Sequence, residues 1–66
     1  MFDAPIKIIN KTYRGCSYTI EVYPQLTSVK AYDLDYGFTI YKHKFMYHSL
    51  AKIHNTVKNE IKKYLK

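Results

Sequence analysis

The sequence predicts an α+β fold in which an antiparallel four-stranded β-meander carries one C-terminal amphipathic α-helix on one face. Three observations predict it. Apolar and polar residues alternate every second position before Phe45, apolar residues recur every three to four positions after Ser49, and glycine or proline separates the alternating segments. A chain of 66 residues is expected to form one domain, so residues 1–66 are treated as a single unit.

The first hairpin is predicted from strands at residues 6–13 and 16–23. The second segment has the clearer pattern, since β-branched and aromatic residues dominate it. Arg14-Gly15 forms a two-residue loop whose glycine can adopt a positive φ. Pro24 ends the second strand, because proline has no N–H to donate to a neighbouring strand.

The second hairpin is predicted from strands at residues 29–34 and 38–43, joined across Asp35-Tyr36-Gly37. Asp33 and Asp35 are interpreted as turn residues, because the other ligands of a calcium loop do not follow them. The first strand of the chain could end at Asn10, and a three-stranded meander stays an alternative to the four-stranded one.

The helix is predicted over residues 49–65, with Ser49 as its N-cap. Its apolar positions fall on one face, whereas its lysines spread over the opposite side. The apolar positions are Leu50, Ile53, Val57, Ile61, Tyr64 and Leu65, and the lysines are Lys52, Lys58, Lys62, Lys63 and Lys66. Glu60 can meet Lys63 or Tyr64 one turn further on.

A single helix can cover only one face of the sheet, so the alternation predicts one buried face and one open face. The predicted helix-facing residues are Ile6, Ile8, Cys16, Tyr18, Ile20, Val22, Val29, Ala31, Phe38 and Ile40. The predicted open-face residues are Lys7, Lys11, Tyr13, Thr19, Glu21, Tyr23, Lys30, Tyr32, Thr39, Tyr41 and His43. Four tyrosines would then share an exposed surface, which favours an interface.

The net charge of +6 lies entirely in residues 42–66. Residues 1–41 hold four basic and four acidic side chains, whereas residues 42–66 hold seven lysines and one glutamate. This asymmetric charge is expected to attract an acidic protein or a nucleic acid. Arginine, the residue that most often reads bases, occurs once, so sequence-specific reading of DNA is not expected.

The chemistry of an enzyme is not indicated, and no catalytic residue, cofactor or metal site is predicted. His43, His48 and His54 lack the spacing of a helical ligand pair, and His54 is expected to pack at the edge of the apolar stripe with a hydrogen bond. Cys16 falls on the core face, where a free cysteine behaves as a small hydrophobic residue.

The compartment is expected to be the cytoplasm. The segment from Met1 to Pro5 has no basic stretch followed by an apolar one, as a secretion signal would have. A lone cysteine provides no internal disulfide, and no apolar run approaches the ~20 residues that a membrane span needs.

In size, residue style and plan, the chain resembles small accessory proteins of phages and mobile elements of low-GC bacteria. The resemblance rests on the short chain as a whole, which ends in Phe45-Met46-Tyr47-His48-Ser49-Leu50 followed by an amphipathic helix. It implies stoichiometric binding, as in DNA-binding accessories, inhibitors of host enzymes or antagonists of defence systems.

The leading hypothesis is therefore a small non-enzymatic binding module, a phage-type inhibitor or regulator of a host protein or nucleoprotein machine. The alternative is sequence-tolerant binding of nucleic acid through the same surfaces, and a third hypothesis is a homodimer formed through the open sheet face. The predicted partner-binding residues are Tyr13, Tyr23, Tyr32, Tyr41, Lys30, Lys52, Lys58, Lys62 and Lys63.

Overall fold

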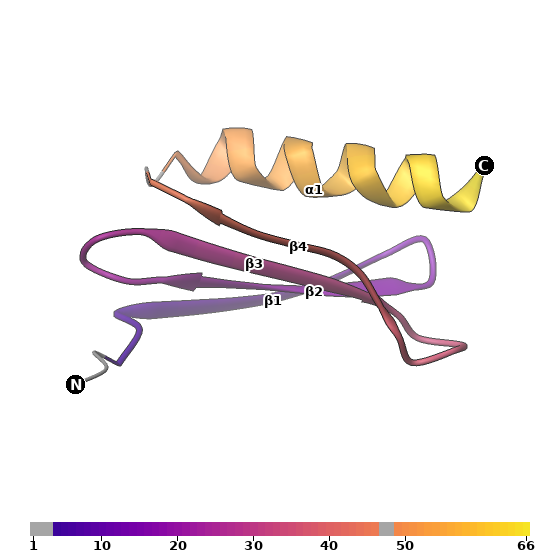
Figure 1. Cartoon of the computed structure of the whole chain (residues 1–66), viewed down its shortest axis with the longest axis horizontal. Coiled ribbons are helices and arrows are strands. Elements are labelled where there is room, and N and C mark those ends of the chain that lie inside the picture. Colours follow the sequence, from indigo (N-terminus) through magenta and orange to yellow (C-terminus); the bar gives the residue numbers. More distant parts are fainter. Residues whose placement is uncertain (1–3, 47–48) are drawn as a thin grey trace.

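The computed structural model describes residues 4–46 and 49–66, which form an open four-stranded antiparallel sheet and one helix (Figure 1). In chain order the elements are β1 Lys7–Tyr13, β2 Cys16–Val22, β3 Thr27–Asp33, β4 Thr39–Phe45 and α1 Leu50–Leu65. The order of the strands in the sheet equals their order in the chain. The predicted α+β meander is confirmed, with four strands rather than three.

The helix lies over one face of the sheet, closest to β3 and β4, and Figure 1 shows it running beside β4. Within residues 4–46 and 49–66, no element covers the opposite face. Every strand boundary lies within two residues of the prediction, and the largest differences are that β3 begins at Thr27 rather than at 29 and that β4 continues to Phe45 rather than 43.

The core lies between α1 and the two central strands. In β2 and β3 every second residue is buried, as the alternation predicts, because each of these strands has a neighbour on both sides and the helix above it. The buried apolar residues are Cys16, Tyr18, Ile20, Val22, Val29, Ala31, Phe45, Ile53, Val57 and Ile61.

The helix buries the middle of its predicted apolar stripe. Ile53, Val57 and Ile61, spaced four residues apart, are fully buried, whereas Tyr64 and Leu65 at the end are 37% and 44% exposed. Ser49 occupies the N-cap position, as predicted, and its backbone carbonyl accepts a hydrogen bond from the Ile53 N–H at 3.0 Å. Its side chain makes no capping hydrogen bond.

The faces predicted for β1 are wrong. Tyr13 lies directly opposite the buried Cys16, so it shares the helix side of the sheet with it. Ile6 and Ile8, which were predicted to face the helix, are 71% and 54% exposed. The residues of β1 on the helix side are Lys7, Ile9, Lys11 and Tyr13.

The reason is the turn between β1 and β2. Arg14 and Gly15 have φ values of 52° and 80°, which is the pattern of a two-residue type I′ turn. Such a turn places the residues before and after it directly opposite each other. Tyr13 must therefore point to the same side as Cys16, whatever the polarity of the other residues in the strand.

The faces predicted for Tyr41 and His43 of β4 are wrong too, because the strand contains an irregularity, whereas Thr39 lies on the open face as predicted. Ala31 pairs with Tyr41 and Tyr32 with Thr39, so Ile40 is an extra residue in β4. The extra residue reverses the alternation beyond it, and the helix-side residues of β4 are Tyr41, His43 and Phe45. Phe38 precedes the strand and is 49% exposed, whereas Ile40 packs against the core as predicted.

Candidate functional site

The four predicted tyrosines do not share one surface. Tyr13 and Tyr41 lie on the helix side, where both pack against the core, and the Lys58 ammonium is 5.6 Å from the centre of the Tyr13 ring. Tyr23 and Tyr32 lie on the open side, as predicted. The prediction that the four tyrosines share the open face is therefore wrong, and its physical cause is the register of β1 and β4.

The tyrosines of the open face are half-buried. The Tyr23 hydroxyl donates to Glu21 Oε1 at 3.2 Å, and desolvation followed by the charge of that carboxylate raises the pKa of Tyr23. Tyr32 lies on β3 two residues from Lys30, which is exposed on the same face. Lys30 is thus placed as predicted, on the open side of the sheet.

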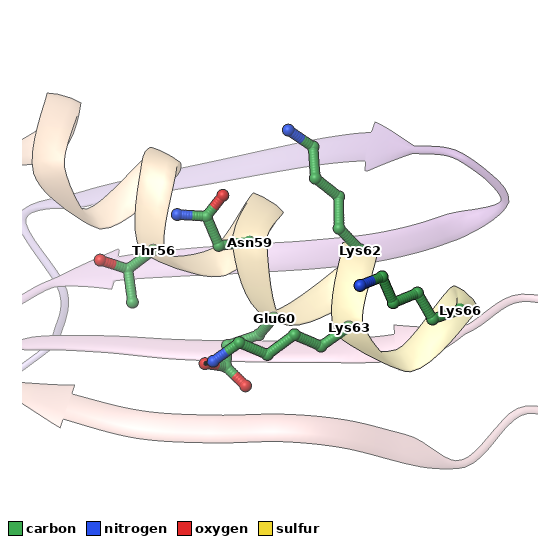
Figure 2. A pocket seen from close by; sticks show the side chains of 6 residues that line it. All are labelled: Thr56, Asn59, Glu60, Lys62, Lys63 and Lys66. Atoms are coloured by element: carbon green, nitrogen blue, oxygen red, sulfur yellow. Dashed lines mark hydrogen bonds and ion pairs between the residues drawn. The ribbon is translucent and has the colours of Figure 1, made fainter.

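The predicted helix lysines differ in their surroundings. Lys52, Lys62 and Lys63 are exposed, whereas Lys58 is half-buried against the Tyr13 ring. Lys63 forms an ion pair with Glu60 at 3.3 Å, as predicted. Figure 2 shows the side chains that line a hollow along this side of α1, and they all come from the helix and the residue that follows it: Thr56, Asn59, Glu60, Lys62, Lys63 and Lys66. A hollow formed by one helix provides no enclosed site.

An exposed aromatic cluster lies at the end of the molecule where the β3–β4 loop meets the C-terminal end of α1. It consists of Tyr36, Phe38 and Tyr64, which are 77%, 49% and 37% exposed, and we call it the end cluster. Tyr36 stacks on Phe38 with ring centres 6.1 Å apart, and Phe38 meets Tyr64 edge to face at 5.9 Å. Leu34 and Leu65, next to it in sequence, are also exposed.

Asp33 organises the loop that carries the end cluster. Its Oδ1 accepts hydrogen bonds from the N–H groups of Asp35 at 2.7 Å and Tyr36 at 3.2 Å. Its backbone carbonyl accepts from the Gly37 N–H at 2.7 Å, and its own N–H donates to the Phe38 carbonyl at 3.0 Å. Gly37 has a φ of 77°, which glycine adopts without strain. The loop therefore has a defined shape.

The same carboxylate ties the loop to the helix. The Tyr64 hydroxyl donates to Asp33 Oδ2 at 2.5 Å. This bond, with further contributions from the loop N–H groups, lowers the pKa of Asp33, although desolvation opposes it. The bond also raises the pKa of Tyr64 to about 12. At neutral pH the neutral phenol and the charged carboxylate thus keep Tyr64 beside Phe38.

The first hairpin adjoins the loop of the second. The Leu34 N–H donates to the Gly15 carbonyl at 3.2 Å, so the Arg14-Gly15 turn lies beside the residues that begin the β3–β4 loop. The Arg14 guanidinium is 5.7 Å from the centre of the Tyr13 ring. The Arg14-Gly15 turn thus adjoins the start of the β3–β4 loop through the backbone, while the exposed Arg14 side chain lies against Tyr13.

Sequence reasoning missed the end cluster because it assigned residues 35–37 to a turn and counted Phe38 as part of a buried strand. The signal that could have found it is the stretch Leu34-Asp35-Tyr36-Gly37-Phe38, in which three large apolar residues surround a tight turn. A turn of this kind lies on the surface, so such residues are exposed whichever face the strands present.

Two titratable groups outside the end cluster, His54 and Cys16, lie in or beside the core. The Tyr18 hydroxyl and His54 Nδ1 are 2.8 Å apart, which confirms the predicted hydrogen bond at the edge of the stripe. Cys16 is buried, as predicted, and desolvation followed by the charges of Asp33 and Asp35 raises its pKa. Among residues 4–46 and 49–66, no three His, Cys, Asp or Glu side chains gather as metal ligands would. His48 lies outside the described residues.

The chain matches no protein-family model, no curated protein and no solved structure. The part of the chain that the structure describes contains no helix long and apolar enough to cross a membrane. Function must therefore be inferred from the surfaces of the chain itself.

Proposed function

We propose that this chain is a small non-enzymatic binding module that docks on a protein partner through the end cluster. The observation that carries the proposal is the exposure of three contacting aromatic rings, Tyr36, Phe38 and Tyr64, on a loop of defined shape. Aromatic side chains provide large contact areas with little conformational freedom to lose, so they dominate protein interfaces.

The order of the loop supports this assignment. Binding costs free energy when side chains and loops must be immobilised, and a preorganised loop avoids part of that cost. The hydrogen bonds to Asp33 hold the loop before any partner arrives. Exposed aromatic residues that are already fixed in space serve docking better than they serve stability, because their apolar surface stays in contact with water.

The resemblance to accessory proteins of phages favours the biological setting of the proposal. We propose an inhibitor or regulator that binds a host protein or nucleoprotein machine stoichiometrically in the cytoplasm. A free buried cysteine is compatible with a reducing compartment. The anchors of the contact would be Tyr36, Phe38 and Tyr64, in place of the predicted Tyr13 and Tyr41.

The test is affinity capture from a lysate of the natural host, followed by titration of the purified partner. We expect the double variant Tyr36→Ala/Phe38→Ala to bind about 30-fold more weakly or worse, which corresponds to the loss of about 2 kcal/mol that defines a hot spot. The matched control is Ile6→Ala/Ile8→Ala, which removes exposed apolar surface from the start of the sheet, away from the end cluster.

The control variant should bind as tightly as the unmodified chain. Near-ultraviolet circular dichroism and a urea transition would verify that both variants stay folded. Retention of the same partner at the same affinity by the Tyr36/Phe38 variant would remove the end cluster as the docking surface.

A further inference from the structure

Three lysines gather on the open face of the sheet. Lys30 on β3 lies directly opposite Lys42 on β4, and Lys44 follows two residues after Lys42, opposite Ser28. Residues two apart in a strand point to the same face and are about 7 Å apart along it. All three side chains are exposed, and we call them the lysine cluster.

The lysine cluster has no counter-ion among the described residues. The ion pair found in that part of the chain joins Lys63 to Glu60 on the helix. Glu21 lies on the same face, on β2 opposite Ser28; its carboxylate accepts a hydrogen bond from Tyr23 and forms no ion pair with these lysines. Two lysines directly opposite each other repel and destabilise a sheet. A surface that keeps such a pair has a place for an anionic ligand.

The neighbours of the lysine cluster suit a phosphate backbone. Tyr32 presents a half-buried ring on the same face, two residues from Lys30. Hydroxyl groups surround these residues on the adjacent positions of the face, which are Ser17, Thr19, Ser28 and Thr39. Lysine, serine, threonine and tyrosine are among the side chains that contact phosphate and sugar in nucleic-acid complexes.

We propose that this open face binds single-stranded nucleic acid, with the lysine cluster on successive phosphates and the Tyr32 ring stacked on a base. An open sheet with an accessible ring suits unpaired bases, which can lie flat on an aromatic side chain. The recognition is sequence-tolerant, because lysines and a ring read charge and stacking rather than base edges.

A second copy of the chain is a poorer occupant of this face. In a homodimer formed face to face, the two copies would bring Lys30, Lys42 and Lys44 against lysines of the same charge. The end cluster lies elsewhere, at the loop end of the molecule, so the nucleic-acid site goes beyond the proposed protein contact and can fail independently of it.

The experiment is fluorescence anisotropy with a labelled mixed-sequence oligonucleotide, measured from about 50 to about 200 mM salt. Three neutralised phosphates predict that the logarithm of the binding constant falls with the logarithm of salt concentration with a slope of about −2. The variant Lys30→Gln/Lys42→Gln/Lys44→Gln should lose most of this slope and bind at least about tenfold more weakly at low salt.

The matched control is Lys52→Gln/Lys62→Gln/Lys66→Gln, which removes the same charge from exposed positions of α1 and the residue that follows it. We expect this control to keep the slope. Equal losses in the two variants would show that net charge alone attracts the oligonucleotide, and absence of binding by the unmodified chain at the lowest salt would also overturn the proposal.

Tyr32 provides the second readout, because stacking does not depend on charge. The variant Tyr32→Ala should bind the single strand at least about fivefold more weakly with an unchanged salt slope, whereas Tyr32→Phe should bind like the unmodified chain. A duplex of the same sequence that binds as tightly as the single strand, or a Tyr32→Ala variant of full affinity, would overturn the assignment to unpaired bases.

Discussion

The sequences of the two central strands and of the two edge strands all alternate between apolar and polar residues. Only in the central strands does this alternation predict which face each side chain occupies. In β2 and β3 every second residue is buried, and the buried positions hold the apolar residues together with Thr27 and Asp33. In β1 and β4 apolar residues such as Ile8 are exposed, while Tyr13 and Tyr41 turn toward the helix. Burial fixes the faces in the centre, whereas turns and an extra residue fix them at the edges.

The difference between the central strands and the edge strands also bears on where the candidate binding residues lie. A residue under the helix is constrained by packing, so its identity says little about partners. Edge strands and loops are constrained less, and both candidate surfaces draw on them: the lysine cluster takes Lys42 and Lys44 from β4, and the end cluster lies on the loop before it. The two candidate surfaces thus take Lys42, Lys44, Tyr36 and Phe38 from an edge strand and a loop, whereas Lys30 and Tyr32 come from the central strand β3.

The largest expected effect tests the constraint in the central strands. Ile20 on β2 is fully buried, so Ile20→Ala should lower the free energy of unfolding by about 2–5 kcal/mol, through lost burial and the cavity that remains. Ile8→Ala, the same type of change on the exposed side of β1, should stay within about 0.5 kcal/mol. Urea denaturation measures both, and similar losses would erase the distinction between centre and edge.

The next effect tests whether the turn sets the register of β1. Gly15 has a φ of 80°, and a Cβ added there meets no atom within 4 Å, so Gly15→Ala costs only backbone strain, about 1–2 kcal/mol. Arg14 has a φ of 52°, and Arg14→Asn should stabilise the hairpin, because Asn-Gly is the preferred type I′ pair. Thermal unfolding should show a lower melting temperature for Gly15→Ala and a higher one for Arg14→Asn. A lower melting temperature for both variants would contradict the turn assignment.

Much of the fold was predictable from the sequence, for physical reasons that can be assigned to particular residues. The faces of β2 followed from four apolar residues at alternate positions, and the helix stripe followed from Ile53, Val57 and Ile61. Tyr13 was predictable as well, since a two-residue turn forces it to the side of Cys16, and that rule should have prevailed over the polarity of β1.

The remaining features depend on contacts that alternation does not contain. The extra residue at Ile40 reverses the faces of β4, and local sequence does not mark its position. The end cluster requires Tyr64 to reach Asp33 from the last turn of the helix, 31 residues away. The lysine cluster requires the pairing of Lys30 with Lys42, which that extra residue sets. The candidate sites were thus harder to predict than the core.

An intermediate effect concerns the bond that joins a central strand to the helix. Desolvation, followed by the charges of Lys58 and Lys11, lowers the pKa of His54, whose Nδ1 lies 2.8 Å from the Tyr18 hydroxyl. The unfolded chain therefore binds a proton more readily than the folded one. The contribution of His54 to the free energy of unfolding is fully present above pH 6.5, and it decreases as the pH falls from there toward the lowered pKa of the folded state.

Thermal unfolding between about pH 7 and about pH 5 measures this loss. His54→Gln should flatten the profile in this range. Identical profiles for the unmodified chain and the His54 variant would mean that other groups cause the acid sensitivity. Asp33, whose pKa is lowered, contributes in a separate range, since its stabilisation is lost as the pH falls below 3.8.

The smallest expected effect is a gain in stability from a charge reversal on the open face, at a residue that is proposed to bind the ligand. Lys42→Glu replaces a repulsive cross-strand pair with an attractive one against Lys30, and it should raise the free energy of unfolding by about 0.2–1 kcal/mol. The control Lys44→Glu, on the same strand and face but opposite Ser28, should gain less, because no lysine lies directly across from it. Equal gains would indicate a response to net charge rather than to the pair.

Both changes should weaken oligonucleotide binding, so Lys42→Glu is expected to improve stability while it impairs binding. A sheet that retains a destabilising lysine pair because an anionic ligand needs it must respond in this way, since the charge that binds the ligand is the charge that strains the pair. A stabilised Lys42→Glu variant with undiminished binding would leave the pair of Lys30 and Lys42 without that explanation.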